Sequence, residues 1–181
     1  MTPAAVSAIL LDFEPNGDGE AAKSRELTLA LLDWSPNPFS RNTFTPGHVT
    51  CTGVVLSPSL EAVLLVHHRR LGRWLLPGGH VEMEDEQPSE TARREVLEET
   101  GADLAAVPPQ LVGCDVHPIP SRGREPLHLH HDLIFAFQAK SLRSGCSPES
   151  RAVVWRPVTK TDDLPGSIQR SIARTLAGRT K

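Results

Sequence analysis

Three glutamates lie close together in the segment REVLEETG, residues 94–101. In a helix, Glu95, Glu98 and Glu99 occupy positions i, i+3 and i+4, so they share one face. Like charges at this spacing repel each other by roughly 0.2–0.5 kcal/mol per pair, and more strongly where water is excluded. The cluster has two interpretations: a solvated helix face softened by Arg94, or a site whose carboxylates hold hard divalent cations such as Mg²⁺.

A glycine pair ahead of the carboxylates favours the cation site. Gly78 and Gly79 follow Pro77, and glycine lets backbone groups approach another group closely. Pro88 suits the first position of a helix, and Gly101 suits the left-handed position after its last turn. A loop that leads into a helix bearing three carboxylates is well suited to Mg²⁺, which binds a few carboxylates together with waters and phosphates.

The stretch GGHVEMEDEQPSETARREVLEETGA, residues 78–102, resembles the Nudix box. The box reads Gly, five residues, Glu, seven residues, and then Arg-Glu-apolar-any-Glu-Glu-any-Gly-apolar. Its second half matches residues 94–102 position by position. The first half carries one extra residue. Counting forward from Gly79 assigns the first acidic position to Asp85, whereas counting back from the second half assigns it to Glu86.

The resemblance implies a fold, a reaction and a set of roles. Nudix proteins are α/β/α sandwiches around a mixed sheet. Nudix enzymes are hydrolases that use metal-activated water to cleave a diphosphate linked to another group, commonly in nucleoside diphosphate-X compounds. By this resemblance Glu95, Glu98, Glu99 and the carbonyl of Gly79 bind Mg²⁺, or Mn²⁺ in its place. Arg94 orients a glutamate, and Glu98 or Glu99 is the general base, with a carboxylate outside the box as the alternative.

Basic side chains upstream of the glycine pair are candidates for substrate contacts. Arg69 and Arg73 lie in the segment HHRRLGRW, residues 67–74, and arginine pairs well with phosphate oxygens. The alternative for both is a solvated turn at the end of a strand. His80 follows the box glycine and either approaches the phosphates or packs against the backbone.

A histidine-rich segment, LHLHHDLIFAF at residues 127–137, is the other candidate for substrate contacts. Because side chains alternate along a strand, His128, His130 and Asp132 share one face. Three interpretations are open. The face lines the catalytic cleft, it is half exposed to water, or it holds a metal such as Zn²⁺, for which no cysteine lies at a suitable spacing.

Hydrophobic periodicity gives the elements that must position these residues. It predicts two helices, over 4–12 and 20–34, and further helices over the box segment and over LPGSIQRSIARTL; strands are predicted over 49–56, 61–68, 111–119, 127–139 and 151–158. We therefore predict an α/β fold of the Nudix type in two parts. Residues 1–45 form a helical extension and a Pro-rich loop, and 46–181 form the domain with a C-terminal helix. The extension is a lid, a packing element or a dimer element.

The composition limits the classes of partner. A net charge of −3 over 181 residues provides no basic surface for nucleic acid or membrane, so a polyanionic substrate needs local cations or bound metal. Three widely spaced cysteines predict reduced thiols in a cytoplasmic protein, and the N-terminus lacks the basic region of a signal peptide. We expect a small-molecule nucleotide or another diphosphate as the substrate, and a homodimer stays an alternative.

Two other functions are open at this level. One is a non-catalytic nucleotide-binding or regulatory module on the same fold, although a pure binder has no need for three mutually repelling acids. The other is an enzyme like the isoprenyl diphosphate isomerases, for which Cys51 and Cys114 are the only cysteines on predicted strands. The substrate itself is not fixed, because specificity lies in loops outside the box. A nucleotide sugar, ADP-ribose, an oxidised nucleotide triphosphate and a dinucleoside polyphosphate all fit.

Overall fold

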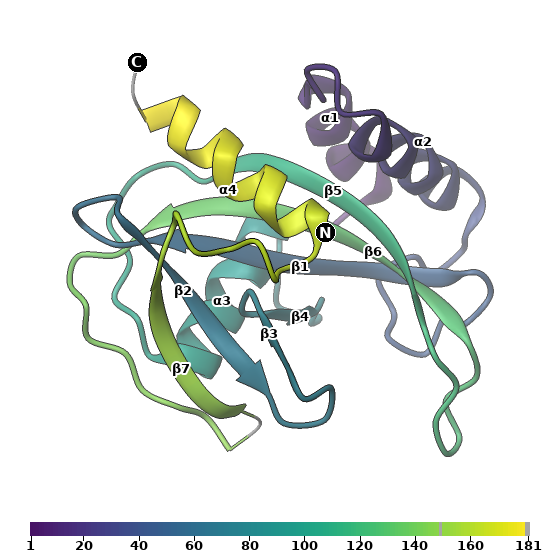
Figure 1. Cartoon of the computed structure of the whole chain (residues 1–181). Coiled ribbons are helices and arrows are strands. Elements are labelled where there is room, and N and C mark those ends of the chain that lie inside the picture. Colours follow the sequence, from purple (N-terminus) through teal and green to yellow (C-terminus); the bar gives the residue numbers. More distant parts are fainter. Residues whose placement is uncertain (149, 180–181) are drawn as a thin grey trace.

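A computed structural model describes residues 1–148 and 150–179 of the chain (Figure 1). The helices are α1 (Pro3–Asp12), α2 (Gly19–Trp34), α3 (Pro88–Thr100) and α4 (Gly166–Arg179). The strands are β1 (Gly47–Leu56), β2 (Ala62–His68), β3 (Arg73–Leu75), β4 (Gly78–His80), β5 (Gln110–Ile119), β6 (His128–Gln138) and β7 (Ser150–Pro157). All the elements predicted from the sequence are present, with ends that differ by up to about three residues, within the ordinary uncertainty of boundaries.

The strands form one mixed sheet. Its main path runs β3-β2-β1-β6-β5, while β4 pairs with β1 and β7 pairs with β2. The β1–β6 pair is parallel, and the remaining pairs are antiparallel. The mixed sheet expected from the Nudix resemblance is therefore confirmed.

Helices cover both faces of this sheet, as an α/β/α sandwich requires. One hydrophobic cluster joins α1, α2 and α3 to one face through residues such as Leu31, Val96 and Leu133. The other face packs against α4, where Ile168 and Ile172 meet strand residues. Figure 1 shows α4 in front of the sheet and α3 behind it.

Two short strands, β3 and β4, were not predicted. Each has three residues, too few for an alternating pattern to be recognised. Strand β4 depends on its glycines, because a Cβ on Gly78 would lie 2.7 Å from the carbonyl oxygen of Cys51 and 2.8 Å from the Cα of Thr52. Only a residue without a side chain lets the box loop pair this closely with β1.

Helix α3 begins and ends where the sequence predicts. Pro88 is its first residue, and Gly101 follows its last turn with φ of 60°. Val96 is fully buried and meets β1 at Gly53, where a Cβ would lie 2.5 Å from Cγ2 of Val96. This close packing fixes α3 against the sheet and so fixes the direction of its carboxylates.

The N-terminal helices share the core of the sheet. Thr28 of α2 lies with its Oγ1 3.1 Å from Nδ1 of His131 on β6. The turn between α1 and α2 is held by α4, since Arg174 donates to the carbonyl of Pro15 at 2.9 Å and to Asp18 at 2.8 Å. These contacts favour the packing element among the three roles considered for the extension. The division of the chain at residue 45 stays a prediction.

No helix within residues 1–148 and 150–179 combines the length and the apolar character of a membrane span.

We expect the packing of α2 to contribute to the stability of the whole fold. Leu31 is 1% exposed in the core, whereas Leu27, one turn earlier on the same helix, is 44% exposed. Leu31→Ala should lower the free energy of unfolding by about 2–5 kcal/mol, and Leu27→Ala by roughly 0.5 kcal/mol. Urea unfolding of both variants measures the difference. Equal losses would show that α2 does not pack on the sheet in solution.

Candidate active site

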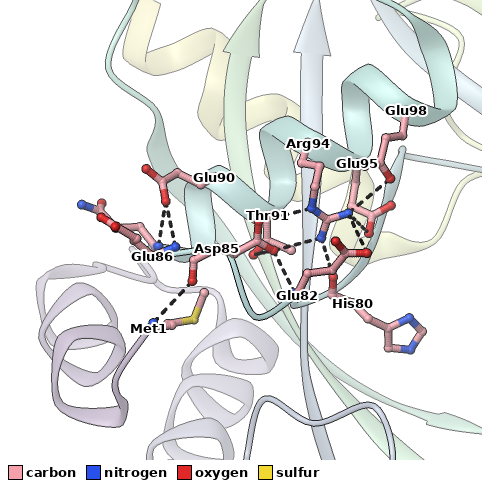
Figure 2. Close-up of polar contacts among 11 residues, drawn as sticks. Met1, His80, Glu82, Asp85, Glu86, Glu90, Thr91, Arg94, Glu95 and Glu98 are labelled. Atoms are coloured by element: carbon pink, nitrogen blue, oxygen red, sulfur yellow. Dashed lines mark hydrogen bonds and ion pairs between the residues drawn. The ribbon is translucent and has the colours of Figure 1, made fainter.

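Arg94 lies at the centre of the polar network in the box (Figure 2). Its Nε and Nη2 donate to the two carboxylate oxygens of Asp85 at 3.2 and 2.9 Å, and Nη2 also donates to the carbonyl of His80 at 2.8 Å. Its Nη1 donates to Glu95 at 3.0 Å and to Glu98 at 3.2 Å. The guanidinium therefore links the loop, the start of the box and the carboxylates of α3.

The acid that contacts Arg94 is Asp85, not Glu86. Asp85 is 6% exposed and also accepts from the hydroxyl of Thr91 at 2.8 Å and the backbone N–H of Glu82 at 2.9 Å. The side chain of Glu86 is exposed. The extra residue of the box thus lies after Asp85, just before the helix begins, and we infer that Asp85 fills the first acidic position.

The three carboxylates on α3 have different surroundings. The side chain of Glu95 is 15% exposed and that of Glu98 is 54% exposed. Glu99 is 8% exposed and accepts a hydrogen bond from the backbone N–H of Gly78 at 3.0 Å. Glu98 is therefore the most accessible of the three to solvent or ligand.

Gly79 allows a carboxylate to come against the backbone. A Cβ on Gly79 would lie 2.5 Å from Oε1 of Glu95, so a side chain here would displace that carboxylate. The structure thus places the backbone of Gly79 directly beside the carboxylate group of Glu95, as expected if both belong to one site.

Burial and neighbouring charge shift the ionisation of this network in opposite directions. Burial raises the pKa of Glu95, and the nearby Glu98 adds to this, although Arg94 opposes it. Burial also pushes the pKa of Asp85 upward, but its hydrogen bonds outweigh this effect and the net pKa is lowered, mainly by Arg94. Arg94 thus favours the ionised form of Asp85, whereas burial makes the charge of Glu95 more costly.

These residues border a cavity of about 1150 Å³, large enough for a nucleotide. Its lining contains both acidic and basic side chains. The acidic residues are Glu82, Glu95, Glu98, Glu99, Asp115 and Asp132, and the arginines are Arg41, Arg69, Arg70 and Arg73. A ligand in this cavity would therefore meet both carboxylates and guanidinium groups.

A buried carboxylate from β6 also reaches the cavity. Asp132 is 8% exposed and accepts from the hydroxyls of Thr50 at 3.0 Å and Thr52 at 2.7 Å. Burial raises its pKa, while the threonine hydrogen bonds lower it. The parallel register pairs Thr50 with Asp132, so the strand order itself assembles this network.

Not all of the remaining residues predicted to contact substrate line the cavity. Arg69, Arg73, His80 and His130 line the cavity. The guanidinium of Arg69 is partly occupied, because it donates to the carbonyls of Pro148 and Ser150. His128 does not line the cavity and packs beside His130 at a ring-centroid distance of 5.2 Å.

Sequence reasoning missed several lining residues. The Nδ1 of His117 lies 2.9 Å from Asp115. Burial lowers the pKa of His117, but the Asp115 hydrogen bond and the charges of Asp132 and Asp115 together outweigh it, so the net pKa is raised. Arg41 comes from the Pro-rich loop before β1. The alternation within 111–119 already places His117 and Asp115 on one face, and that signal could have found them.

The two strand cysteines lie away from the cavity. Cys51 is fully buried and Cys114 is 3% exposed, and neither lines the cavity wall. Burial raises the pKa of both thiols, that of Cys114 to about 12. The isomerase-like interpretation therefore lacks the cysteine that it requires.

Fold and site together define a class: an α/β/α sandwich whose loop–helix segment presents three carboxylates to a cavity. The sequence pattern of the NUDIX domain family matches residues 47–176. The chain belongs to the NUDIX domain family. None of the curated proteins compared with it is similar enough in sequence to count as a match.

Solved structures show the same fold at low sequence identity. A NUDIX hydrolase from Nitrosomonas europaea is 23% identical, with a TM-score of 0.55, over 72% of this chain and 88% of that one. The NUDIX domain of NrtR from Shewanella oneidensis, determined with ADP-ribose, is 19% identical, with a TM-score of 0.52, over 83% of this chain and 96% of its own. A MutT protein from Methanosarcina mazei is 22% identical, with a TM-score of 0.51, over 74% of this chain and 95% of that one.

The Asp85–Arg94 pair should stabilise the fold in a pH-dependent way. Asp85→Asn removes one charge of a largely buried pair, and we expect a loss near the lower end of about 3–5 kcal/mol at neutral pH. Because the folded-state pKa of Asp85 is lowered, its contribution is complete above the ordinary value of 3.8 and is lost as the pH falls through the folded-state value. The gap between wild type and variant should therefore shrink in acid, as measured by urea unfolding at several pH values.

Glu86→Gln is the matched control for this prediction. Its exposed side chain should change the free energy of unfolding by roughly 0.5 kcal/mol or less at any pH. The assignment of Asp85 fails if Glu86→Gln destabilises the protein and Asp85→Asn does not.

Proposed function

We propose that this protein is a Mg²⁺-dependent hydrolase that cleaves a diphosphate linkage in a nucleoside diphosphate-X type of substrate. One observation carries the proposal. Glu95, Glu98 and Glu99 line the same cavity as four arginines, and Glu95 and Glu99 lie against the backbone of Gly79 and Gly78. A diphosphate is an anion that both a bound cation and guanidinium groups would stabilise.

The donor set fits magnesium. Three carboxylates and a backbone carbonyl offer only hard oxygen ligands, which Mg²⁺ and Mn²⁺ prefer. The raised pKa of Glu95 reflects a buried charge with incomplete compensation, and a divalent ion would supply the missing positive charge. We therefore assign Glu95, Glu98, Glu99 and the Gly79 carbonyl as the residues that would hold the metal.

The roles of the protein groups follow from their contacts. When bound, Mg²⁺ would neutralise the diphosphate and lower the pKa of a coordinated water. Arg94 holds Glu95 and Glu98 in place through Nη1. One oxygen of each is engaged, that of Glu98 by Arg94 and that of Glu99 by Gly78, but Glu98 is half exposed to the cavity whereas Glu99 is buried. These surroundings favour Glu98 over Glu99 as the general base.

The substrate class rests on the shape and charge of the cavity. Arg41, Arg70 and Arg73 provide exposed cations on its wall. The fold relative from Shewanella oneidensis that was determined with ADP-ribose supports a nucleoside diphosphate linked to a second group as the substrate.

We also keep the cytoplasmic location as a proposal, supported by three unpaired cysteines.

Turnover should separate the general base from the metal ligands. Glu98→Gln removes the general base together with one metal ligand, so we expect it to lower kcat by roughly 10²–10⁴ even at saturating Mg²⁺, the usual contribution of a positioned base. Glu95→Gln removes a group that acts only as a ligand, so its main effect should be to raise the Mg²⁺ concentration that activity needs. The measurement is the release of the two phosphorylated products of hydrolysis from ADP-ribose, nucleotide sugars, dinucleoside polyphosphates and oxidised nucleotide triphosphates.

Glu90→Gln is the control on the same helix. Glu90 accepts from the backbone N–H groups of Glu86 and Gln87, and glutamine can still accept there, so activity should be close to that of the wild type. If no compound is turned over with Mg²⁺ or Mn²⁺, while ADP-ribose raises the unfolding temperature, the protein is a binding module instead. A product of unchanged mass would indicate isomerisation.

A further inference from the structure

Three histidines converge where β1 and β6 run side by side. The parallel register pairs His48 directly with His130, and His128 lies two residues earlier on the same face of β6. One ring nitrogen from each lies within 4.8 Å of the others. This histidine cluster (His48, His128 and His130) shares no residue with the carboxylates of α3.

Hydrogen bonds fix which nitrogen of two rings carries the proton. The Nδ1 of His48 lies 3.0 Å from the carbonyl of Thr43, and the Nδ1 of His128 lies 2.8 Å from the carbonyl of Pro126. A carbonyl can only accept, so both Nδ1 atoms donate, and in the neutral rings both Nε2 atoms keep a lone pair. Metal-binding histidines are oriented in the same way, with the other nitrogen donating to a carbonyl or a carboxylate.

One of these lone pairs has no partner in the described part of the chain. His48 is 1% exposed, and its Nε2 is buried without a hydrogen-bond partner among those residues. A buried polar nitrogen without a partner is uncommon, and an unseen ion is one of its ordinary explanations. The neighbouring rings of His128 and His130, with centroids 5.2 and 4.9 Å away, provide the remaining nitrogens.

The cluster offers only imidazole nitrogens, which ligate metals in their neutral form. Neutral imidazoles suit zinc and its neighbours in the transition series, whereas Mg²⁺ prefers oxygen ligands.

We propose that His48, His128 and His130 bind a divalent transition-metal ion, with Zn²⁺ as the best fit, at a site separate from the carboxylate site. Three imidazoles leave one position of a tetrahedral ion for another ligand. Zn–N bonds of about 2.0–2.1 Å place ligand nitrogens about 3.3 Å apart, so modest side-chain rotations would close the cluster around the ion.

His80 connects this site to the box. Its carbonyl accepts from Arg94, while its ring lies 5.1 Å from His48 and 5.3 Å from His130, between ring centroids. Figure 2 shows that ring turned away from the carboxylates. Because His80 and His130 both line the cavity, the ion would lie at the border of the space proposed for the substrate.

Metal binding tests the proposal without any assay of turnover. The protein, free of any histidine tag and stripped with EDTA, is titrated with Co²⁺ and with Zn²⁺ in excess Mg²⁺. We expect the visible absorption of cobalt bound to nitrogen, removed by Zn²⁺. His128→Gln and His130→Gln should each weaken binding by more than the roughly 10–100-fold that loss of a ligand's hydrogen-bond partner costs.

Two matched variants separate this site from others. His67→Gln on β2 lies outside the cluster and should keep wild-type affinity. Glu95→Gln/Glu98→Gln weakens the carboxylate site and should also keep it. The proposal fails if the wild type binds no Zn²⁺, if both cluster variants bind as tightly as wild type, or if the double glutamate variant abolishes binding. The proposed hydrolase activity would stand in each of these cases.

A measurement on the unmutated protein covers the case in which the buried variants do not fold. X-ray absorption of the Zn²⁺-loaded wild type should show the scattering pattern of several imidazole rings. A shell of oxygen ligands without that pattern would overturn the proposal.

Discussion

The guanidinium of Arg94 is the interaction on which the carboxylate site depends. Three of its contacts reach residues far along the chain or across the loop: both oxygens of Asp85 and the carbonyl of His80. A planar fork with fixed donor directions can make these bonds at once, and a lysine ammonium cannot. Because Nη1 still reaches Glu95 and Glu98, the same cation that closes the loop also holds together acids that repel each other.

The sheet supplies the second constraint. The parallel pairing of β1 with β6 extends over ten residue pairs, from Gly47 with Leu129 to Leu56 with Gln138. A register shift of one residue would turn every side chain to the opposite face, which would separate Thr50 from Asp132 and His48 from His130. The polar face of the cavity and the histidine cluster are therefore products of one register.

The sequence predicted most of the elements and the carboxylate helix, because these depend on local patterns. Pro88, Gly101 and the spacing of the three glutamates all act within a few residues of each other. The alternation that places His128, His130 and Asp132 on one face is also local, and the structure has these residues on one face of β6. The roles of these residues are proposals, as they were on the sequence alone.

What the sequence could not provide depends on contacts between distant segments. Counting along the box could not decide whether Asp85 or Glu86 fills its first acidic position, because only the path of the loop decides which carboxylate reaches Arg94. His48 showed no pattern of its own, because its partners lie 80 and 82 positions later in the chain. The short strands β3 and β4 have three residues each, too few to show a strand pattern in advance, and β4 also depends on pairing that its glycines permit.

The two proposed ion sites differ in a way that lets one lie in the cavity and the other at its border. The carboxylates offer charged oxygens, and their mutual repulsion makes any nearby divalent cation favourable, so softness and geometry must provide the selectivity. The imidazoles offer neutral nitrogen donors in a buried setting, where a strongly hydrated ion such as Mg²⁺ would lose its water for poor ligands. His80 lies between the two sites. The carboxylate site would favour Mg²⁺, the ion that a diphosphate requires, and the histidine cluster would favour Zn²⁺, which would remain with the protein.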